Sequence, residues 1–462
     1  MSQDRTRRRV AVVAAAVLAL TPMLSACASR VAHKEIVAAA GGTASTTGSS
    51  KAGGTSTASS GAGTTASSTS GAQTGTPSGQ PATGTGGPSE SSGGTNAVAG
   101  AACTGQLSTI TLGNVGTYSG LIGAILGVTQ PALQVWAQYV NDNGGLACHP
   151  VRVVSADDGG DPSTAATLTA NMVTNEGAIA FVSDMIPLTY NAVNAYVTEH
   201  NIPVIGGDSS SPPWFQSPML FPSGNLYPTN ADLVLKTGAA AGKTKVAYIY
   251  CVEQPTCATS WDPSHAAADG VQVVYTSTVS LANPSFVAQC IGARNAGAET
   301  ILAIMDGNGI GRMARNCASQ GYKPQYGMIM LALTAAVADV PELDGLLIGS
   351  NNFPWVDDQK PLQAAMQAAI KRYNPGIELG GGTSTAWTSG MIAVAASTHL
   401  SANPTSADFL QGLWDINNND IGGLTTPLTY TQNAPATATN CSFVMQVHDG
   451  GFTDPNGGSY VC

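Results

Sequence analysis

Residues 109–158 read TITLGNVGTYSGLIGAILGVTQPALQVWAQYVNDNGGLACHPVRVVSADD, and this stretch decides the fold. Its first seven residues are β-prone, apolar residues then recur at helical spacing from Val128 to Val140, and Val151–Val154 is β-prone again. A strand, a helix and a second strand predict a parallel pair with a right-handed crossover. Ligands of such sheets lie beyond the carboxyl ends of the strands, so we expect Gly116–Gly120 and Asp157–Asp158 at one edge.

Composition and motifs exclude several classes of function. Only 10% of the residues are charged and the net charge is -10, so we expect no nucleic-acid partner, which requires clustered Lys and Arg. The chain has no G-x-S-x-G or H-E-x-x-H motif, and the stretch 238–244, GAAAGKT, is one residue short of the phosphate-binding spacing. We therefore expect neither an enzyme nor a cofactor. A secreted hydrolase using Asp157 or Asp158 with Asp306 is the least favoured alternative.

The N-terminus predicts export and lipid anchoring. Four arginines among residues 5–9 precede an apolar run, Val10–Leu20, which is too short to span a membrane. Leu24-Ser25-Ala26-Cys27 follows and resembles a bacterial lipobox, whose cysteine is lipidated. The sequence thus indicates a signal peptide, residues 1–27, and a protein anchored through Cys27 to the outer face of the cell membrane. An ordinary signal peptide is the alternative, and Thr6-Arg7-Arg8 leaves twin-arginine export open. We expect no second hydrophobic run of about 18 or more residues, and therefore a mature protein that is anchored and does not span the membrane.

Eight further cysteines would then lie in an oxidising compartment, where disulfides persist. Eight cysteines allow 105 pairings, and proximity favours Cys103–Cys148, Cys251–Cys257, Cys290–Cys317 and Cys441–Cys462. A four-cysteine metal site would require C-x-x-C pairs, which the sequence lacks, so no metal is expected.

Residues 28–106 are mostly Gly, Ser, Thr and Ala, and such a segment cannot bury enough apolar surface to offset its ordering entropy. We expect a disordered tether with an r.m.s. span of roughly 45 Å. From Leu107 onward strands and helices alternate, and an irregular passage at 209–228 separates two βα arrays. We predict an α/β protein of two lobes, each a mainly parallel sheet flanked by helices. Lobe 1 would comprise 107–228 plus about 352–412, and lobe 2 would comprise 229–351 plus about 413–462.

Four motifs in order resemble the type I periplasmic binding proteins, in particular the leucine/isoleucine/valine-binding receptors of ABC importers. They are Tyr118-Ser119-Gly120, the Asn141–Gly145 helix end, Asp157-Asp158 with Pro162, and the Ile202–Ile205 strand. The resemblance spans nearly all of the folded region. It implies two lobes joined by three crossovers, which close by a hinge motion on a solute.

The resemblance also implies where the solute binds. The loops after the third and fourth strands carry Ser183, Asp184, Gly207, Asp208 and Ser209, and the second lobe contributes Asp306 and Asn308. Tyr118 and Ser119 lie on the loop after the first strand, where a simple turn is the alternative. Tyr227, in the irregular passage, is a candidate to line the site or to pack the connection between the lobes.

One departure concerns the ligand. Amino-acid-binding relatives have a carboxylate after the strand that matches Tyr326–Leu331, but here Met328–Ala332 contains no acid. A buried ammonium without a counter-ion is costly. Either Asp184, Asp208 or Asp306 supplies the charge, or the ligand is not an α-amino acid, which we favour. The sequence therefore predicts a monomeric solute-binding lipoprotein that works with an ABC permease. It would bind a small polar or amphipathic molecule such as a branched-chain amino acid, an amide or a related compound. A sensory receptor or cell-wall scaffold is the alternative.

Overall fold

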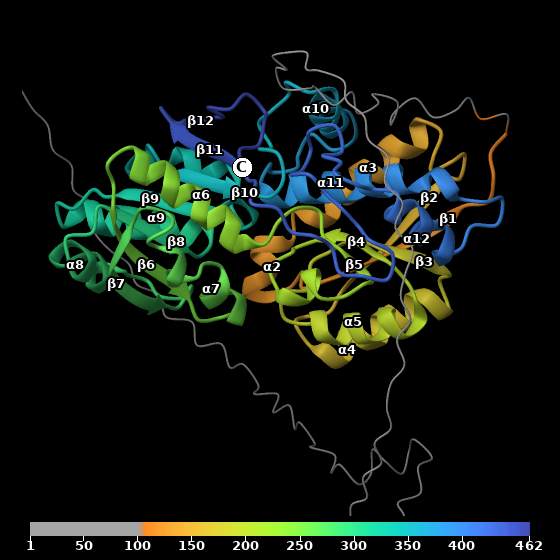
Figure 1. Cartoon of the computed structure of the whole chain (residues 1–462), viewed down its shortest axis with the longest axis horizontal. Helices are drawn as coiled ribbons and strands as arrows, with labels where there is room; N and C mark the ends of the chain where they lie inside the picture. Colours follow the sequence, from red (N-terminus) through yellow and green to blue (C-terminus); the bar gives the residue numbers. More distant parts are fainter. Residues whose placement is uncertain (1–102, 104) are drawn as a thin grey trace, which may run out of the picture. The chain divides into compact units, whose positions relative to one another are not determined.

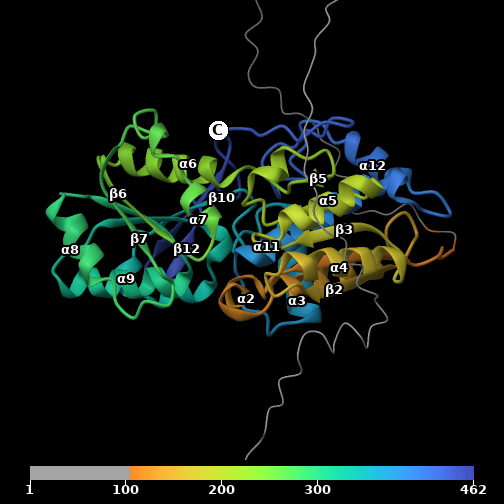
Figure 2. The same cartoon turned by 90° about the horizontal axis from the view of Figure 1, so that it is seen from below.

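The structure is a computed structural model that describes residue 103 and residues 105–462. The predicted signal peptide, Cys27 and almost all of the predicted tether lie outside the described residues. Figures 1 and 2 show two sheets, each covered by helices on both faces.

The first sheet has five strands in the order β2-β1-β3-β4-β5, and all of its pairs are parallel. The register aligns Ile110 with Val151 and Gly116 with Asp157, so the two loops predicted to share an edge do so. The central strand β1 is buried along its whole length, as expected of a parallel sheet covered on both faces. The strands are β1 Ile110–Gly116, β2 Val151–Asp157, β3 Ala178–Asp184, β4 Val204–Gly207 and β5 Leu220–Phe221.

Helices α3 and α11 cover one face of this sheet, and α4 and α5 cover the other (Figure 1). Helix α11 is buried around nearly its whole circumference. Gly390 allows the close contact with α3, because a Cβ there would lie 2.3 Å from the ring of Trp136. The helices of this lobe are α2 Gly120–Leu126, α3 Thr129–Asp142, α4 Pro162–Thr174, α5 Tyr190–His200, α10 Pro361–Tyr373, α11 Gly381–Ala396 and α12 Ser406–Trp414.

The second sheet has seven strands in the order β12-β11-β10-β9-β8-β6-β7, with β11 and β12 antiparallel at one edge. Helix α6 covers one face, and α8 and α9 cover the other (Figure 2). The strands are β6 Lys245–Cys251, β7 Gln272–Val279, β8 Thr300–Ile304, β9 Gln325–Ile329, β10 Leu347–Ser350, β11 Phe443–His448 and β12 Gly451–Thr453. The helices are α6 Tyr227–Ala240, α7 Pro255–Thr259, α8 Val287–Asn295 and α9 Gly307–Ser319.

Three segments connect the two sheets, and buried polar side chains tie them together. Asn352 Nδ2 and Thr425 Oγ1 both donate to the carbonyl of Ser223, each at 2.6 Å. Asn225 Nδ2 donates to the carbonyl of Cys441 at 2.5 Å, and Ser442 Oγ donates to that of Ser350 at 2.8 Å. The crossings therefore lie side by side, which suits a hinge.

The third crossing comes later in the chain than the sequence indicated. Residues 413–462 were assigned to the second lobe, but Tyr430 stacks edge-on against Phe221 of β5 and donates to the carbonyl of Pro222 at 2.7 Å. Within 413–462, the elements of the second sheet are β11 and β12. The loop before them has no periodic pattern, so the sequence could not show which sheet it packs on.

The expectation that the chain has no second long hydrophobic run was wrong. The stretch Gly120–Asp142 is long and apolar enough to cross a membrane by length and composition. It comprises α2 and α3, and in the structure Leu133 and Trp136 are fully buried in the hydrophobic core. Its apolar character is that of a core helix.

The structure joins the same four cysteine pairs that proximity favours, Cys103–Cys148, Cys251–Cys257, Cys290–Cys317 and Cys441–Cys462. The shortest loop is closed by Cys251 and Cys257, which are six residues apart and follow β6 directly. The last pair ties the C-terminal residue to the third crossing. Cys251–Cys257 thus stabilises the loop after β6, and Cys441–Cys462 stabilises the third crossing between the lobes.

Candidate functional site

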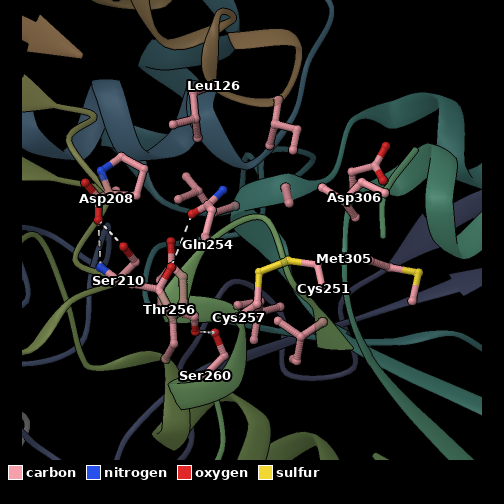
Figure 3. A pocket seen from close by; sticks show the side chains of 18 residues that line it. Leu126, Asp208, Ser210, Cys251, Gln254, Thr256, Cys257, Ser260, Met305 and Asp306 are labelled. Atoms are coloured by element: carbon pink, nitrogen blue, oxygen red, sulfur yellow. Dashed lines mark hydrogen bonds between the residues drawn. A yellow bond between two sulfur atoms is a disulfide. The ribbon is translucent and has the colours of Figure 1, made fainter. Parts of the chain in front are cut away.

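A pocket with a cavity volume of about 60 Å³, partly open to solvent, lies where the carboxyl ends of both sheets meet. From the first lobe it is lined by Ile125, Leu126, Pro187, Asp208 and Ser210. From the second lobe it is lined by Tyr227 at the start of α6 and by Cys251, Gln254, Thr256, Cys257, Ser260, Leu281, Ile304, Met305, Asp306, Ile329, Leu331 and Ala332. Figure 3 shows Asp208 and Asp306 on opposite sides of this space. A pocket built from strand ends of two lobes is a favoured place for a small ligand.

Asp208 is placed by the tight turn that ends β4. Gly207 has a φ of 158°, and a Cβ there would lie 2.1 Å from the carbonyl oxygen of Asp184, so the close approach requires glycine. Asp208 is 2% exposed. Its Oδ1 accepts hydrogen bonds from the backbone N–H and the hydroxyl of Ser210, and its Oδ2 accepts from the N–H of Ile186 at 2.8 Å. Burial raises the pKa of Asp208, although these hydrogen bonds oppose the rise.

Two more buried carboxylates, Asp184 and Asp158, lie next to Asp208 at this edge. Asp184 Oδ1 accepts from the N–H of Val115 at 3.0 Å, whereas its Oδ2 has no partner among the described residues. Burial, together with the negative charges of Asp158 and Asp208, raises the pKa of Asp184 well above its usual value. Within residues 105–462 no ion pair includes any of the three. The edge therefore groups three acids, and the described part of the chain supplies no cation that pairs with them.

Asp158 has a different role from the other two. Its Oδ1 accepts from Thr117 Oγ1 at 2.8 Å and from the N–H of Gly160 at 2.7 Å, and its Oδ2 accepts from Thr189 Oγ1 at 2.6 Å. Both oxygens are thus used to order the loops at the sheet edge. The following helix is capped by Asp161, whose side chain accepts from the N–H of Thr164.

The two tyrosines predicted for the site differ in whether their hydroxyl groups already have a hydrogen-bond partner. Tyr227 opens α6 and lines the pocket, and its buried hydroxyl has no hydrogen-bond partner among the described residues. Burial, and then the charge of Asp208, raise the pKa of Tyr227 well above its usual value. Tyr118 instead donates its hydroxyl hydrogen to Asn114 Oδ1 at 2.9 Å. Tyr118 is therefore committed to the lobe interior, and Tyr227 can meet a ligand.

The second-lobe wall follows β6. The Cys251–Cys257 disulfide closes a short loop that presents Gln254 and Thr256 to the pocket. Thr256 Oγ1 donates to Gln254 Oε1 at 3.2 Å, and Ser260 Oγ donates to the carbonyl of Thr256 at 2.7 Å (Figure 3). These bonds leave the pocket with a small polar strip on an otherwise apolar wall.

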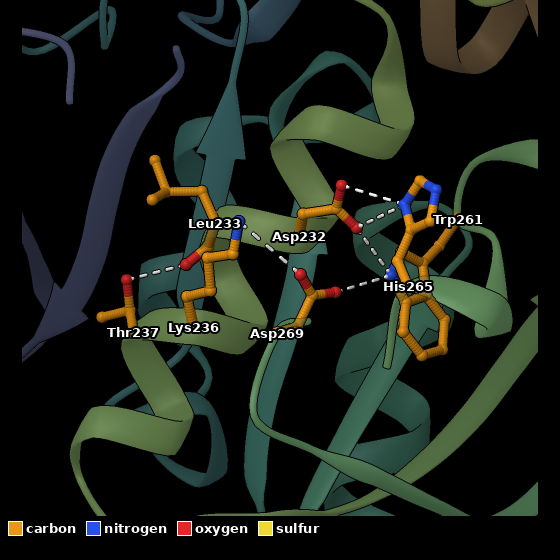
Figure 4. Close-up of polar contacts among 7 residues, drawn as sticks. All are labelled: Asp232, Leu233, Lys236, Thr237, Trp261, His265 and Asp269. Atoms are coloured by element: carbon orange, nitrogen blue, oxygen red, sulfur yellow. Dashed lines mark hydrogen bonds and ion pairs between the residues drawn. The ribbon is translucent and has the colours of Figure 1, made fainter. Parts of the chain in front are cut away.

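This wall is supported from behind by Trp261, which follows Ser260 and is 1% exposed. Its Nε1 donates to Asp232 Oδ1 at 2.9 Å and to Asp269 Oδ2 at 3.3 Å (Figure 4). His265 Nδ1 lies 3.1 Å from Asp232 Oδ2, and Lys236 Nζ lies 3.7 Å from Asp269 Oδ1. Burial, and then the charge of Asp232, raise the pKa of Asp269 to about 6. Unlike the acids of the first lobe, this pair has basic partners.

The structure brings together some of the predicted site residues and separates others. Asp208, Tyr227 and Asp306 line the pocket. Asp306 also caps α9 by accepting from the N–H of Gly309 at 3.1 Å. Beyond these three, the predicted residues belong to one of three groups: the buried sheet edge, the loop after β1, and a neighbouring cavity that shares Asp306. These are Ser183, Asp184, Gly207 and Ser209 at the edge, Tyr118 and Ser119 on the loop, and Asn308 in the cavity.

The buried serines at the edge carry unusual backbone. Ser183 and Ser209 have positive φ values of 58° and 49°, and neither hydroxyl has a partner among the described residues. Sequence reasoning missed Ser210 and the wall formed by Gln254, Thr256 and Ser260. The available signal was a pair of cysteines directly after a strand, because the carboxyl end of β6 had to face the same edge as β8.

Comparisons with known proteins agree with this arrangement. Residues 109–451 match the family described as periplasmic binding protein. A fatty acid ABC transporter substrate-binding protein from Thermomonospora curvata has a similar structure, with a TM-score of 0.63, 17% identity, and coverage of 76% of this chain and 93% of that one. No curated protein matches this chain in sequence.

Two further solved structures are similar. An ABC transporter solute-binding protein from R. palustris in complex with benzoate has a TM-score of 0.62 and 14% identity, covering 77% of this chain and 98% of that one. A leucine-binding protein from Thermotoga maritima has a TM-score of 0.62 and 14% identity, covering 76% and 99%. At these identities the likeness shows the shared fold.

Proposed function

The chain belongs to the periplasmic binding protein family, and from this premise we propose that it delivers one unmodified solute to an ABC importer. The observation that carries the proposal is the pocket, which takes its lining from both lobes. A solute held there contacts both halves, so it favours the closed arrangement over the open one. The three polar crossings at Ser223, Asn352 and Cys441 supply the hinge.

The chemistry of the pocket supports a small amphipathic solute. Its surface is mainly apolar, with Leu126, Met305 and Ile329 among the lining residues. A solute rich in hydroxyl groups would leave many of its polar atoms unpaired against such walls, which is costly. The structurally similar proteins from Thermomonospora curvata and R. palustris are described with a fatty acid and with benzoate, which are also largely apolar.

The proposal extends to the location of the protein. The basic segment, the short apolar run and the Leu24–Cys27 tetrapeptide support lipidation at Cys27. The Gly/Ser/Thr-rich stretch that follows would hold the binding lobes off the membrane. Replacement Cys27→Ser should move the protein from the membrane fraction to the soluble fraction, and unchanged membrane association would contradict the anchor.

A ligand screen by thermal unfolding tests the binding function. A solute at 100 times its Kd adds about 2.7 kcal/mol to the free energy of unfolding. The variant Ala332→Trp places a large side chain in the pocket and should abolish every such shift without lowering the melting temperature of the unliganded protein. Control Ala336→Trp changes a residue of the neighbouring cavity and should keep the shifts.

Two results would contradict the proposal. In the first, no amine, amino acid, amide, sugar or organic acid stabilises the protein. In the second, mass spectrometry finds the bound solute converted to a product, because a transport receptor releases what it captured.

A further inference from the structure

The charge of the pocket identifies the head group of its solute. Two of the lining residues, Asp208 and Asp306, are acids, and none is Lys, Arg or His. Asp306, which caps α9, lies on the opposite side of the pocket from Asp208 (Figure 3). Asp208 is held rigidly by three donors, and the neighbouring Asp184 has an oxygen without a partner. A carboxylate solute brought against Asp208 would be desolvated beside a like charge, which is unfavourable.

A second observation is independent of the acids. Tyr227 lines the pocket, and its hydroxyl is buried with no partner among the described residues. Tyr227 as a whole is 6% exposed. A buried hydroxyl without a partner is costly, so such a group in a native protein calls for a ligand or a water. Its oxygen can accept a hydrogen bond, and the charge of Asp208 is close enough to contribute to its raised pKa.

An ammonium group fits these two residues. It offers three N–H donors and no acceptor, so it can donate to Asp208 and to Tyr227 together. Its charge would balance the acidic sheet edge, where the described residues provide no cation. Hydrogen bonds between charged partners are about twice as strong as neutral ones.

We propose that the solute is an apolar amine without a carboxylate, whose ammonium group binds Asp208 and Tyr227 while its body packs against Leu126 and Met305. This inference rests on the proposed function and refines it. It also explains why no acid follows β9: the counter-ion of the ammonium comes from the first lobe, at the turn after β4.

Isosteric probes test the head group without any mutation. Isothermal titration of the full-length protein in detergent would compare 2-phenylethylamine, 2-phenylethanol and 3-phenylpropionate, and then hexylamine, hexanol and heptanoate. We expect each amine to bind at least tenfold more tightly than its alcohol and its acid. If an alcohol or an acid binds as well as its amine, or more tightly, the inference fails while the proposed function stands. If none of the six compounds binds, the inference fails, and the proposed function fails with it only if the wider thermal screen also finds no stabilising solute.

Two variants locate the head group. Asp208→Asn should weaken amine binding at least tenfold and leave alcohol binding within twofold. Because Asp208 also accepts the N–H of Ile186, this variant could lose its fold, and Tyr227→Phe provides a second test that keeps the shape of the side chain. Tyr227→Phe should weaken amine binding severalfold. The control Asp142→Asn removes an exposed acid that pairs with Arg372 outside the pocket, and it should leave amine affinity unchanged. Unchanged affinity in a folded Tyr227→Phe, or in a folded Asp208→Asn, would overturn the assignment.

Discussion

Two groups of buried acids differ in what surrounds them. In the second lobe Asp232 and Asp269 share the indole N–H of Trp261, and His265 and Lys236 lie beside them. In the first lobe Asp184 and Asp208 lie at the sheet edge, and no ion pair within residues 105–462 includes them. We infer that Asp232 and Asp269 in the second lobe hold the structure together, and that Asp184 and Asp208 in the first lobe are completed by a ligand.

The largest effect should come from removing the centre of the structural group. Trp261→Ala leaves a cavity and two acids without their shared donor, so the free energy of unfolding should fall by about 3–5 kcal/mol. Urea denaturation measures this change. Trp261→Phe, which keeps most of the volume and loses the N–H, should cost about 1–3 kcal/mol. A loss below about 1 kcal/mol for the alanine variant would show that the cluster is not structural.

A smaller effect, of opposite sign, is expected at the sheet edge. The native pKa of Asp184 is raised above its unfolded value. The folded state therefore binds the proton more tightly, and the stability of the wild type falls as pH rises from about 3.9 through the raised pKa. Asp184→Asn removes this loss, so the stability of the variant relative to the wild type should be higher at pH 8 than at pH 4.

The control for that experiment is Asp158→Asn. Because both oxygens of Asp158 accept hydrogen bonds from Thr117, Gly160 and Thr189, this variant should be destabilised at either pH. Urea midpoints at the two pH values measure both variants. If Asp184→Asn loses stability at both pH values as Asp158→Asn does, the ionised carboxylate of Asp184 does not destabilise the wild type.

The smallest effect should come from the exposed partner of the structural group. Lys236 is 52% exposed in its side chain and lies 3.7 Å from Asp269. Such pairs contribute about 0–1 kcal/mol and weaken with salt. Lys236→Met should therefore lower the unfolding free energy by less than about 1 kcal/mol, and the difference should shrink in 1 M NaCl. A larger, salt-independent loss would mean that Lys236 is essential to the cluster.

The sequence predicted the architecture because the signal for it is local. Periodicity from Val128 to Val140 and the strands on either side define a βα unit, and the carboxyl ends of parallel strands must share an edge. Asp208 and Asp306, which line the pocket, were instead named by the resemblance to type I periplasmic binding proteins.

What the sequence could not show depends on tertiary contacts. The wall at Gln254 and Thr256 forms because the Cys251–Cys257 loop folds back and Trp261 is held between two acids 8 and 29 residues away. Helix α6 was not predicted, since its start at Tyr227 lies in a passage rich in Ser and Pro. The role of Tyr118 was also hidden, because its partner Asn114 lies on the strand before it.

The most direct test is a crystal structure of the protein with 2-phenylethylamine. The account predicts that the amine lies between the lobes with its nitrogen about 2.7–3.2 Å from a carboxylate oxygen of Asp208 and from the hydroxyl oxygen of Tyr227. A nitrogen that faces solvent, or an amine bound outside the pocket, would contradict it.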